Sequence, residues 1–305
     1  MADALRASAL AATHPASNAP GILAMLAGSG AFVSNDTMVK LLGSDLPPGE
    51  IMLLRGFLAV VLLTAAAAWF GALRLPLATL RSQAFTWRLV GELGSTFAFI
   101  ISLMHMRLAD SSGVQQFQPL AVTAASAIFF AEPVGWRRWL AALVGLIGVL
   151  LIVKPGTGAF EPFAILAGIC VLFVALRDLA TRAVPAGAPL LMLALTSAAA
   201  VMVGGLGLLP FETWVMPNGR NIAMLVVASS FLVCGYVFIT MSVRIGELSV
   251  VVPFRYASVI FAVLLQWAIW SVLPDRWALA GIALVVGAGL YTFHREQMRR
   301  SAAAR

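Results

Sequence analysis

Two stretches of this sequence, Met106-Arg107-Leu108-Ala109-Asp110 and Val243-Arg244-Ile245-Gly246-Glu247, repeat one pattern at an offset of 137 residues. In each stretch an arginine is followed by an apolar residue, a small residue and an acid. The same offset pairs Ser112 with Ser249. Matches that fall in order along a chain indicate an internal duplication, so we expect two copies of one folding unit.

The composition around these stretches is that of a membrane protein. Of the 305 residues, 61% are hydrophobic and 11% are charged, and the mean hydropathy is +0.96. Soluble domains carry about 25% charged residues, and one or two of them could not bury this much apolar surface. The composition therefore excludes a soluble enzyme, a nucleic-acid-binding domain and a disordered chain.

Apolar runs long enough to cross a bilayer, which takes about 20 residues, follow one another along the chain. Turn-forming clusters such as Leu46-Pro47-Pro48-Gly49 separate them. The runs predict ten membrane-spanning helices, over residues 20–42, 50–70, 84–106, 110–131, 135–153, 160–182, 188–210, 220–243, 247–271 and 276–294.

The repeat and the helix count together predict the architecture. Because five is odd, a second copy of a five-helix unit enters the membrane from the opposite face. The expected fold is an all-α integral membrane protein of ten transmembrane helices, built as two inverted five-helix repeats over residues 20–153 and 160–294. A disordered cytoplasmic tail is expected at 1–19 and a basic cytoplasmic tail at 295–305.

Lysine and arginine counts in the short loops predict the orientation, because cytoplasmic loops carry the excess of these residues. One set of loops and tails holds twelve and the other holds four. The larger set is Arg6, Arg74, Arg81, Arg88, Arg137, Arg138, Arg182, Arg244, Arg295, Arg299, Arg300 and Arg305; the smaller is Arg107, Lys154, Arg220 and Arg276. We therefore expect a multi-pass protein of a bacterial-type inner membrane with both termini cytoplasmic. The high pI is then a topology signal, and no nucleic-acid partner is expected.

Inverted repeats are typical of secondary transporters, whose substrate sites lie near the midplane between the repeats. This chain resembles the drug/metabolite transporter superfamily, and within it the EamA-type ten-helix exporters. The resemblance is carried by the two repeated stretches above, by Phe129-Phe130-Ala131-Glu132, and by the glycine-rich segments 143–152 and 281–289. One departure is that the second half, at Gln266-Trp267-Ala268-Ile269-Trp270, lacks an acid equivalent to Glu132.

Within that superfamily, Gln115-Gln116-Phe117-Gln118-Pro119 and the aromatic-rich ninth helix are similar to the YddG-type exporters of aromatic amino acids. The resemblance implies export of aromatic or other bulky apolar amino acids by alternating access around a midplane cavity. Export of drugs or other metabolites on the same fold is the alternative. No Walker-type phosphate loop occurs in the sequence, so ATP is not expected to drive transport directly.

Polar groups inside apolar runs are candidate site residues because they are costly in a bilayer. Gln115 and Gln118 share one helix face and Gln116 is turned about 100° away, while Pro119 frees a backbone carbonyl near position 115. These amides line a substrate cavity or make interhelical hydrogen bonds. Arg255 could bind a substrate carboxylate, or pair with Glu247 or Asp178.

Further candidates are aromatic or ionisable. Tyr236 and Phe99 supply rings that line the cavity or pack between helices. Asp36 and Lys40 lie four residues apart on the first helix, and Asp178 and Arg182, with Arg177 adjacent, repeat the arrangement on the sixth. We interpret these groups as ion pairs that act as a gate or packing latch. Glu92 on the third helix suits proton coupling if it is unpaired, or pairs with a residue such as Arg55.

Other chemistry has little support. Cys170 and Cys234 lie in separate apolar runs with no metal-ligand spacing, so no metal, cofactor or disulfide is expected. The sequence predicts no enzyme; an intramembrane aspartyl enzyme would need Asp36 and Asp178 to meet. The expected partners are a small-molecule substrate and the lipid bilayer, and the expected state is a monomer.

Overall fold

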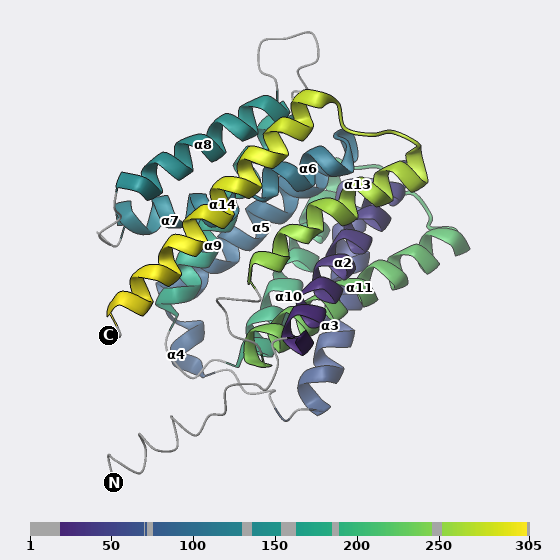
Figure 1. Cartoon of the computed structure of the whole chain (residues 1–305). Helices are drawn as coiled ribbons and strands as arrows, with labels where there is room; N and C mark the ends of the chain where they lie inside the picture. Colours follow the sequence, from purple (N-terminus) through teal and green to yellow (C-terminus); the bar gives the residue numbers. More distant parts are fainter. Residues whose placement is uncertain are drawn as a thin grey trace.

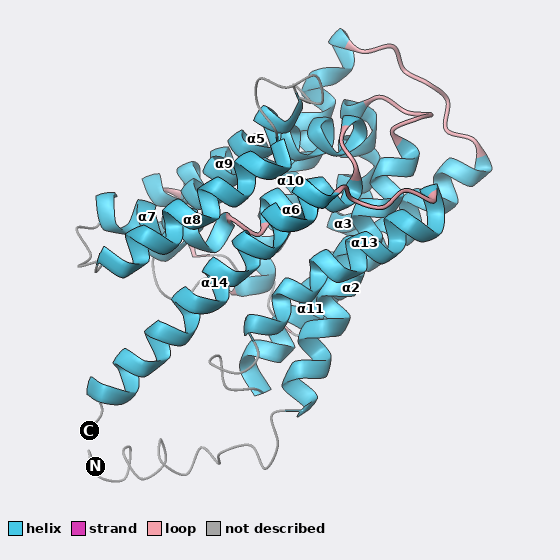
Figure 2. Ribbon diagram, turned by 45° about the horizontal axis from the view of Figure 1, so that its top comes forward, coloured by secondary structure: helices cyan, strands magenta, loops and turns pink. Residues whose placement is uncertain are grey.

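The structure, a computed structural model, describes residues 19–69, 71, 76–129, 136–153, 163–184, 189–245 and 252–303. Within these residues the chain forms α-helices and two short 3-10 helices, and no strand (Figures 1 and 2). The elements are α2 (Ala19–Leu42), α3 (Pro48–Trp69), α4 (Leu77–Leu80), α5 (Gln83–His105), α6 (Leu108–Gln115), α7 (Gln118–Phe129), α8 (Trp136–Val153), α9 (Phe163–Ala183), α10 (Leu190–Leu208), η1 (Leu209–Phe211), α11 (Gly219–Ile245), η2 (Val252–Tyr256), α13 (Ala257–Trp270) and α14 (Arg276–Ala303).

Six of the described helices are long and apolar enough to cross a membrane, namely α2, α3, α5, α9, α10 and α11. Shorter apolar helices lie at Trp139–Ile152, Phe254–Trp270 and Arg276–Tyr291. The all-helical prediction is therefore confirmed for the described residues, and their long apolar helices are consistent with a membrane protein.

Within the described residues, the predicted spans differ from the helices in four places, one of which is the span 247–271, where the 3-10 helix η2 precedes α13. The span at 110–131 is two helices, α6 and α7, that meet at a turn at Gln116 and Phe117, two to three residues before Pro119. The short helix α4 was not predicted. Helix α14 continues through residues 295–303, which were expected to form a tail. Pro119, the second residue of α7, accounts for the break between α6 and α7, because proline cannot donate the backbone hydrogen bond that would join them.

Helices from the two halves of the chain pack against one another in pairs. Helix α2 packs on α11, α3 on α10, α5 on α9 and α8 on α14 (Figure 1). Glycines permit close approach at these crossings. A Cβ atom added to Gly91 would lie 2.7 Å from the backbone nitrogen of Arg177, and one on Gly148 would lie 2.7 Å from the carbonyl oxygen of Gly281. The start of α2 and the end of α14 lie toward the same end of the bundle (Figures 1 and 2).

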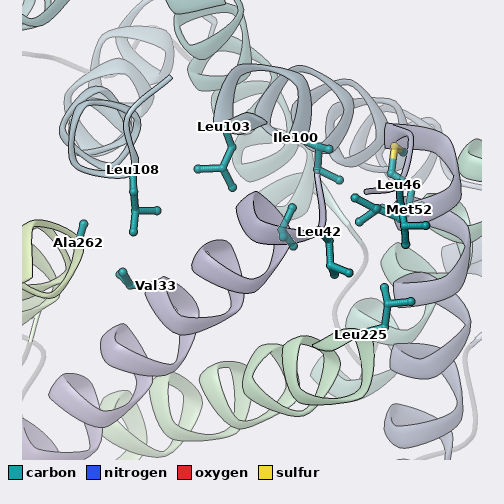
Figure 3. Close-up of a cluster of buried hydrophobic side chains, with 12 residues drawn as sticks. Val33, Leu42, Leu46, Met52, Ile100, Leu103, Leu108, Leu225 and Ala262 are labelled. Atoms are coloured by element: carbon teal, nitrogen blue, oxygen red, sulfur yellow. The ribbon is translucent and has the colours of Figure 1, made fainter. Parts of the chain in front are cut away.

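The largest buried cluster lies where α2, α3, α5, α11 and α13 converge (Figure 3). Ile51, Leu42, Ile100 and Leu103 are fully buried there. Outward-facing positions of the same helices carry many exposed leucine, valine and tryptophan side chains, such as Trp69 on α3 and Val226 on α11. Helices that are apolar all round suit a bilayer, where lipid covers the outer face.

Candidate functional site

Seven charged side chains gather where the helices of the two halves meet, and we call them the ionic cluster. Its members are Asp36 on α2, Arg55 on α3, Arg88 and Glu92 on α5, Arg177 and Asp178 on α9, and Arg255 in η2. Each sits in an apolar helix, so its charge needs a partner or water.

Arg177 is the link between α5 and α9. Its Nη1 lies 3.6 Å from Oε2 of Glu92, and its Nη2 and Nε lie 2.9 Å and 3.0 Å from Oδ1 of Asp178. The close approach at Gly91 brings the Arg177 backbone against the turn that carries Glu92. Glu92 is therefore paired with Arg177, rather than unpaired or held mainly by Arg55.

Asp36 and Arg55 form a second part of the cluster, between α2 and α3. Arg55 donates from Nη1 to Oδ1 of Asn35 at 3.3 Å, and Asn35 donates from Nδ2 to Oδ1 of Asp36 at 2.9 Å. Arg55 also supplies the main electrostatic attraction on Asp36. The aspartates Asp36 and Asp178 thus each lie beside an arginine, which does not suit a pair of carboxylates that share a proton.

Arg88 belongs to the ionic cluster, although the lysine and arginine count above placed it in a loop. It is 8% exposed within α5 and donates to Oγ of Ser197 on α10 at 2.7 Å. Glu92, one helical turn away, is its main attractive neighbour. The i, i+4 spacing of Arg88 and Glu92 was the signal that could have placed Arg88 inside the membrane.

Arg255 differs from the other arginines of the cluster because it is an exposed residue, whereas Arg55 and Arg88 are buried and Arg177 is half-buried. Asp178 exerts the largest electrostatic attraction on it, and the charge of Arg177 opposes that attraction. Tyr236 on α11 also lies within electrostatic reach, and its ring contacts Phe32 edge to face at 5.3 Å. The alternative partner Glu247 lies outside the described residues, as do Glu132 and the side chain of Arg182.

The three glutamines at the α6–α7 break make polar contacts with one another and with neighbouring helices. Gln115 donates to Sγ of Cys170 on α9 at 3.2 Å, and Gln118 donates to Gln115. Gln116, on the other face, donates to Oγ of Ser258 on α13 at 2.9 Å. For Gln115 and Gln116 these contacts are hydrogen bonds between helices, and Gln118 lies on a different helix from Gln115. Phe99 packs between two apolar clusters.

Lys40 lies at one end of the bundle, apart from the cluster. Its ammonium donates to the carbonyl oxygen of Leu103 at 2.7 Å and to that of Met106, at the end of α5, and it lies 5.8 Å from the Trp270 ring. Asp36 instead accepts from Asn35. The expected Asp36–Lys40 ion pair is thus replaced by separate partners for the two groups.

Near Lys40, polar contacts join α6, α13 and the start of α14. Arg107 lies 2.6 Å from Asp110 and 3.2 Å from Asp275. The buried Gln266 accepts from the backbone nitrogen of Ala109 at 2.8 Å and donates to the carbonyl oxygen of Val272 at 3.1 Å. We call Lys40, Arg107, Gln266 and Asp275 the polar latch.

Metal chemistry has no visible basis in the described residues, where no group of three or more histidine, cysteine, aspartate or glutamate side chains could hold an ion.

Comparison with known proteins points to transporters. Residues 19–154 match the sequence model of the EamA-like transporter family. The chain is 24% identical to the S-adenosylmethionine uptake transporter of Rickettsia felis over 88% of this chain and 90% of that protein. It is 25% identical to the pseudopaline exporter CntI of Pseudomonas aeruginosa over 87% and 93%, and 24% identical to the riboflavin transporter of Vibrio cholerae over 87% and 90%.

A solved crystal structure shares the fold at a TM-score of 0.62 and 22% identity, covering 91% of this chain and 98% of the other. The transporters compared above move substrates other than aromatic amino acids, so the narrower similarity to YddG-type exporters has no support from them. Residues 19–154 are thus similar to the EamA-like transporter family, and most of the chain is similar to curated metabolite transporters.

Proposed function

We propose that this protein is a secondary transporter of small amphipathic metabolites that carry an amino-acid head group and a flat ring. The observation that carries the proposal is the ionic cluster, in which the exposed residue Arg255 lies within electrostatic reach of charged side chains from helices of both halves. A guanidinium binds a carboxylate through two parallel hydrogen bonds, which is the geometry that an amino-acid head group needs.

The packing pairs support two inverted repeats and alternating access. If residues 20–153 and 160–294 are two copies, α2 corresponds to α9, α3 to α10, α5 to α11 and α8 to α14. If each helix is replaced by its counterpart in the other copy, the α2–α11 pair becomes the α9–α5 pair. The α3–α10 and α8–α14 pairs become themselves, so the observed packing has the symmetry of two related copies. The ionic cluster then lies between the repeats, where inverted-repeat transporters bind their substrates.

The break between α6 and α7 and the break before α13 support a substrate site at the ionic cluster. Helix α6 ends at Gln115, and the segment before α13 is the 3-10 helix η2, which carries Arg255. Broken helices near the middle of a membrane expose backbone and side-chain polar groups to a cavity. Gln116 and Ser258 join the two broken segments by a hydrogen bond.

The substrate class follows from the groups present. A head group with a carboxylate fits Arg255, and rings fit the Tyr236–Phe32 pair. Aromatic amino acids have this combination, and so does S-adenosylmethionine, the substrate in the name of one relative. Drugs or other metabolites remain the second candidate because riboflavin and pseudopaline are named for other relatives.

We further propose a monomer in a bacterial inner membrane with both termini cytoplasmic, exporting its substrate. The arginine-rich loops support this orientation, and the polar latch would close the opposite, outer end. Reporter fusions after residue 305 and within 213–218 test the orientation. We expect cytoplasmic and external signals, respectively, and a reversed pattern would refute the orientation.

Transport by purified protein in sealed liposomes tests the function. Labelled tryptophan, S-adenosylmethionine and riboflavin should be offered with and without a pH gradient. Saturable flux of tryptophan or S-adenosylmethionine that Arg255→Gln removes is the expected result. Flux of riboflavin alone, undiminished in Arg255→Gln, would refute the amino-acid head group. Absence of flux for all three would refute the substrate class.

A further inference from the structure

We propose that Asp178 binds the ammonium group of the substrate, so that Asp178 and Arg255 together select zwitterions over simple acids or amines. This assignment rests on the proposed function, and it gives a role in specificity to a residue that the sequence indicated only as part of a gate or latch.

Asp178 is the accessible acid of the ionic cluster. Its side chain is 42% exposed, whereas that of Glu92 is 10% exposed. Asp36 is half-buried and already accepts from Asn35 beside Arg55. A substrate that enters the cluster would therefore meet Asp178 before the other two carboxylates.

Asp178 also has a free acceptor. Both contacts from Arg177 fall on Oδ1, through Nη2 at 2.9 Å and Nε at 3.0 Å. Among the described residues, Oδ2 has no hydrogen-bond partner. An ammonium group can bind Oδ2 while Arg177 keeps its contacts with Oδ1 and Glu92, so the cluster need not rearrange.

The position beside Arg255 supplies the opposite charge. Asp178 is the main electrostatic attraction on Arg255, which is an exposed residue, and the Asp178 side chain is 42% exposed. Among the described residues, the Arg255 guanidinium has no hydrogen bond or ion pair. A neighbouring anion and cation that are each incompletely paired match the two charges of an amino-acid head group. Such a head group would form charge-assisted hydrogen bonds with both, and these are stronger than hydrogen bonds between neutral groups.

Three ligands that share one ring system separate the two charges. Tryptophan carries both charges, indole-3-propionate lacks the ammonium group and tryptamine lacks the carboxylate. Equilibrium binding of each to the purified full-length protein in detergent should be measured for the wild type, Asp178→Asn, Asp178→Glu and Arg255→Gln. Asp45→Asn serves as the charge-matched control, because Asp45 lies at a helix end, 3.9 Å from Arg220.

The wild type should bind tryptophan more tightly than either analogue. Asp178→Asn should raise the Kd for tryptophan and tryptamine by about tenfold, the effect of one charge-assisted hydrogen bond. Its Kd for indole-3-propionate should stay unchanged or fall, because the variant leaves more positive charge around the carboxylate. Arg255→Gln should show the opposite selectivity, Asp178→Glu should retain tryptamine binding, and Asp45→Asn should match the wild type.

Two results would overturn the assignment, and they are distinguishable. A wild type that binds none of the three ligands would refute the proposed substrate class and this role with it. A wild type that binds tryptophan, combined with Asp178→Asn losing all three ligands equally or none, would refute the role of Asp178 alone. Size-exclusion profiles establish whether each variant is folded, and for a misfolded Asp178→Asn the Asp178→Glu variant decides the result.

Discussion

Arg177 on α9 lies 3.6 Å from Glu92 on α5, at the crossing where Gly91 lets the two helices touch. The two residues belong to different halves of the chain, so this pair joins the halves inside the bundle. Breaking a buried pair by removing one partner leaves an uncompensated charge and is strongly destabilising.

We therefore expect Glu92→Gln and Arg177→Gln each to lower the free energy of unfolding, and the double variant to lose less than the sum of the two. The coupling should be about 1–3 kcal/mol, as for residues within one ionic network. Unfolding of the purified protein by SDS titration measures it. The Asp45–Arg220 pair, at 3.9 Å with Arg220 69% exposed, provides the matched cycle and should show almost no coupling. Equal coupling in the two cycles would contradict a special role for the Glu92–Arg177 pair.

Lys40 provides a test between two pairings. The ammonium donates to the carbonyl oxygens of Leu103 and Met106, while Asp36 accepts from Asn35. Lys40→Met should destabilise the protein by about 1–3 kcal/mol, because it leaves carbonyl groups at the end of α5 without a donor. SDS unfolding of Asp36→Asn, Lys40→Met and the double variant should give additive losses. Strong coupling between the two substitutions would instead indicate a direct Asp36–Lys40 ion pair.

The sequence predicts the positions of most described helices, because both the lipid-facing and the buried positions of a membrane helix are apolar. Apolar runs of about 20 residues therefore stand out from the loops between them. It also places a helix-breaking proline near the end of α6 and turns Gln116 about 100° away from Gln115, since both depend only on local helix geometry. Which side chains meet across helices depends on how each helix is rotated and at what angle the helices cross. The spacing of residues in the sequence carries neither quantity.

Particular residues show this limit. The spacing of Asp36 and Lys40 permits an ion pair, but the carbonyl groups at the end of α5 lie within reach of Lys40 and take its place. Glu92 acquires Arg177 because Gly91 allows a close crossing between segments far apart in the sequence. Arg88 lies close to a loop in the sequence but is buried against Ser197.

Gly91 itself is predicted to be intolerant of substitution. A Cβ atom there would lie 2.7 Å from the backbone nitrogen of Arg177, and backbone cannot move aside cheaply. Gly91→Ala should lower the melting temperature in detergent and weaken substrate binding, since it separates Glu92 from Arg177. Gly168→Ala is the matched control, because nothing lies within 4 Å of a Cβ at this position on α9. That change should be neutral or stabilising by about 0.5–1 kcal/mol, as alanine is the better helix former. Equal losses in both variants would refute the close crossing as the cause.

The polar latch makes a prediction about opening that uses a native residue as the reporter. Cys170 is 2% exposed and accepts a hydrogen bond from Gln115, so a water-soluble maleimide should modify it slowly. Arg107→Gln removes contacts with Asp110 and Asp275. If the latch keeps its end of the bundle closed, loss of about 1 kcal/mol from these partly exposed pairs should raise the open population, and the rate of Cys170 modification, about fivefold.

The rate should be measured in a Cys234→Ser background, so that Cys170 is the single cysteine of the chain. Arg220→Gln removes an arginine from a 3.9 Å pair near the same end and serves as the control; its rate should stay at the wild-type value. An unchanged rate in Arg107→Gln would show that the Arg107 pairs do not restrict opening. If the modification rate rises equally in both variants, loss of any arginine at that end is enough to open the bundle, and the Arg107 contacts have no specific role.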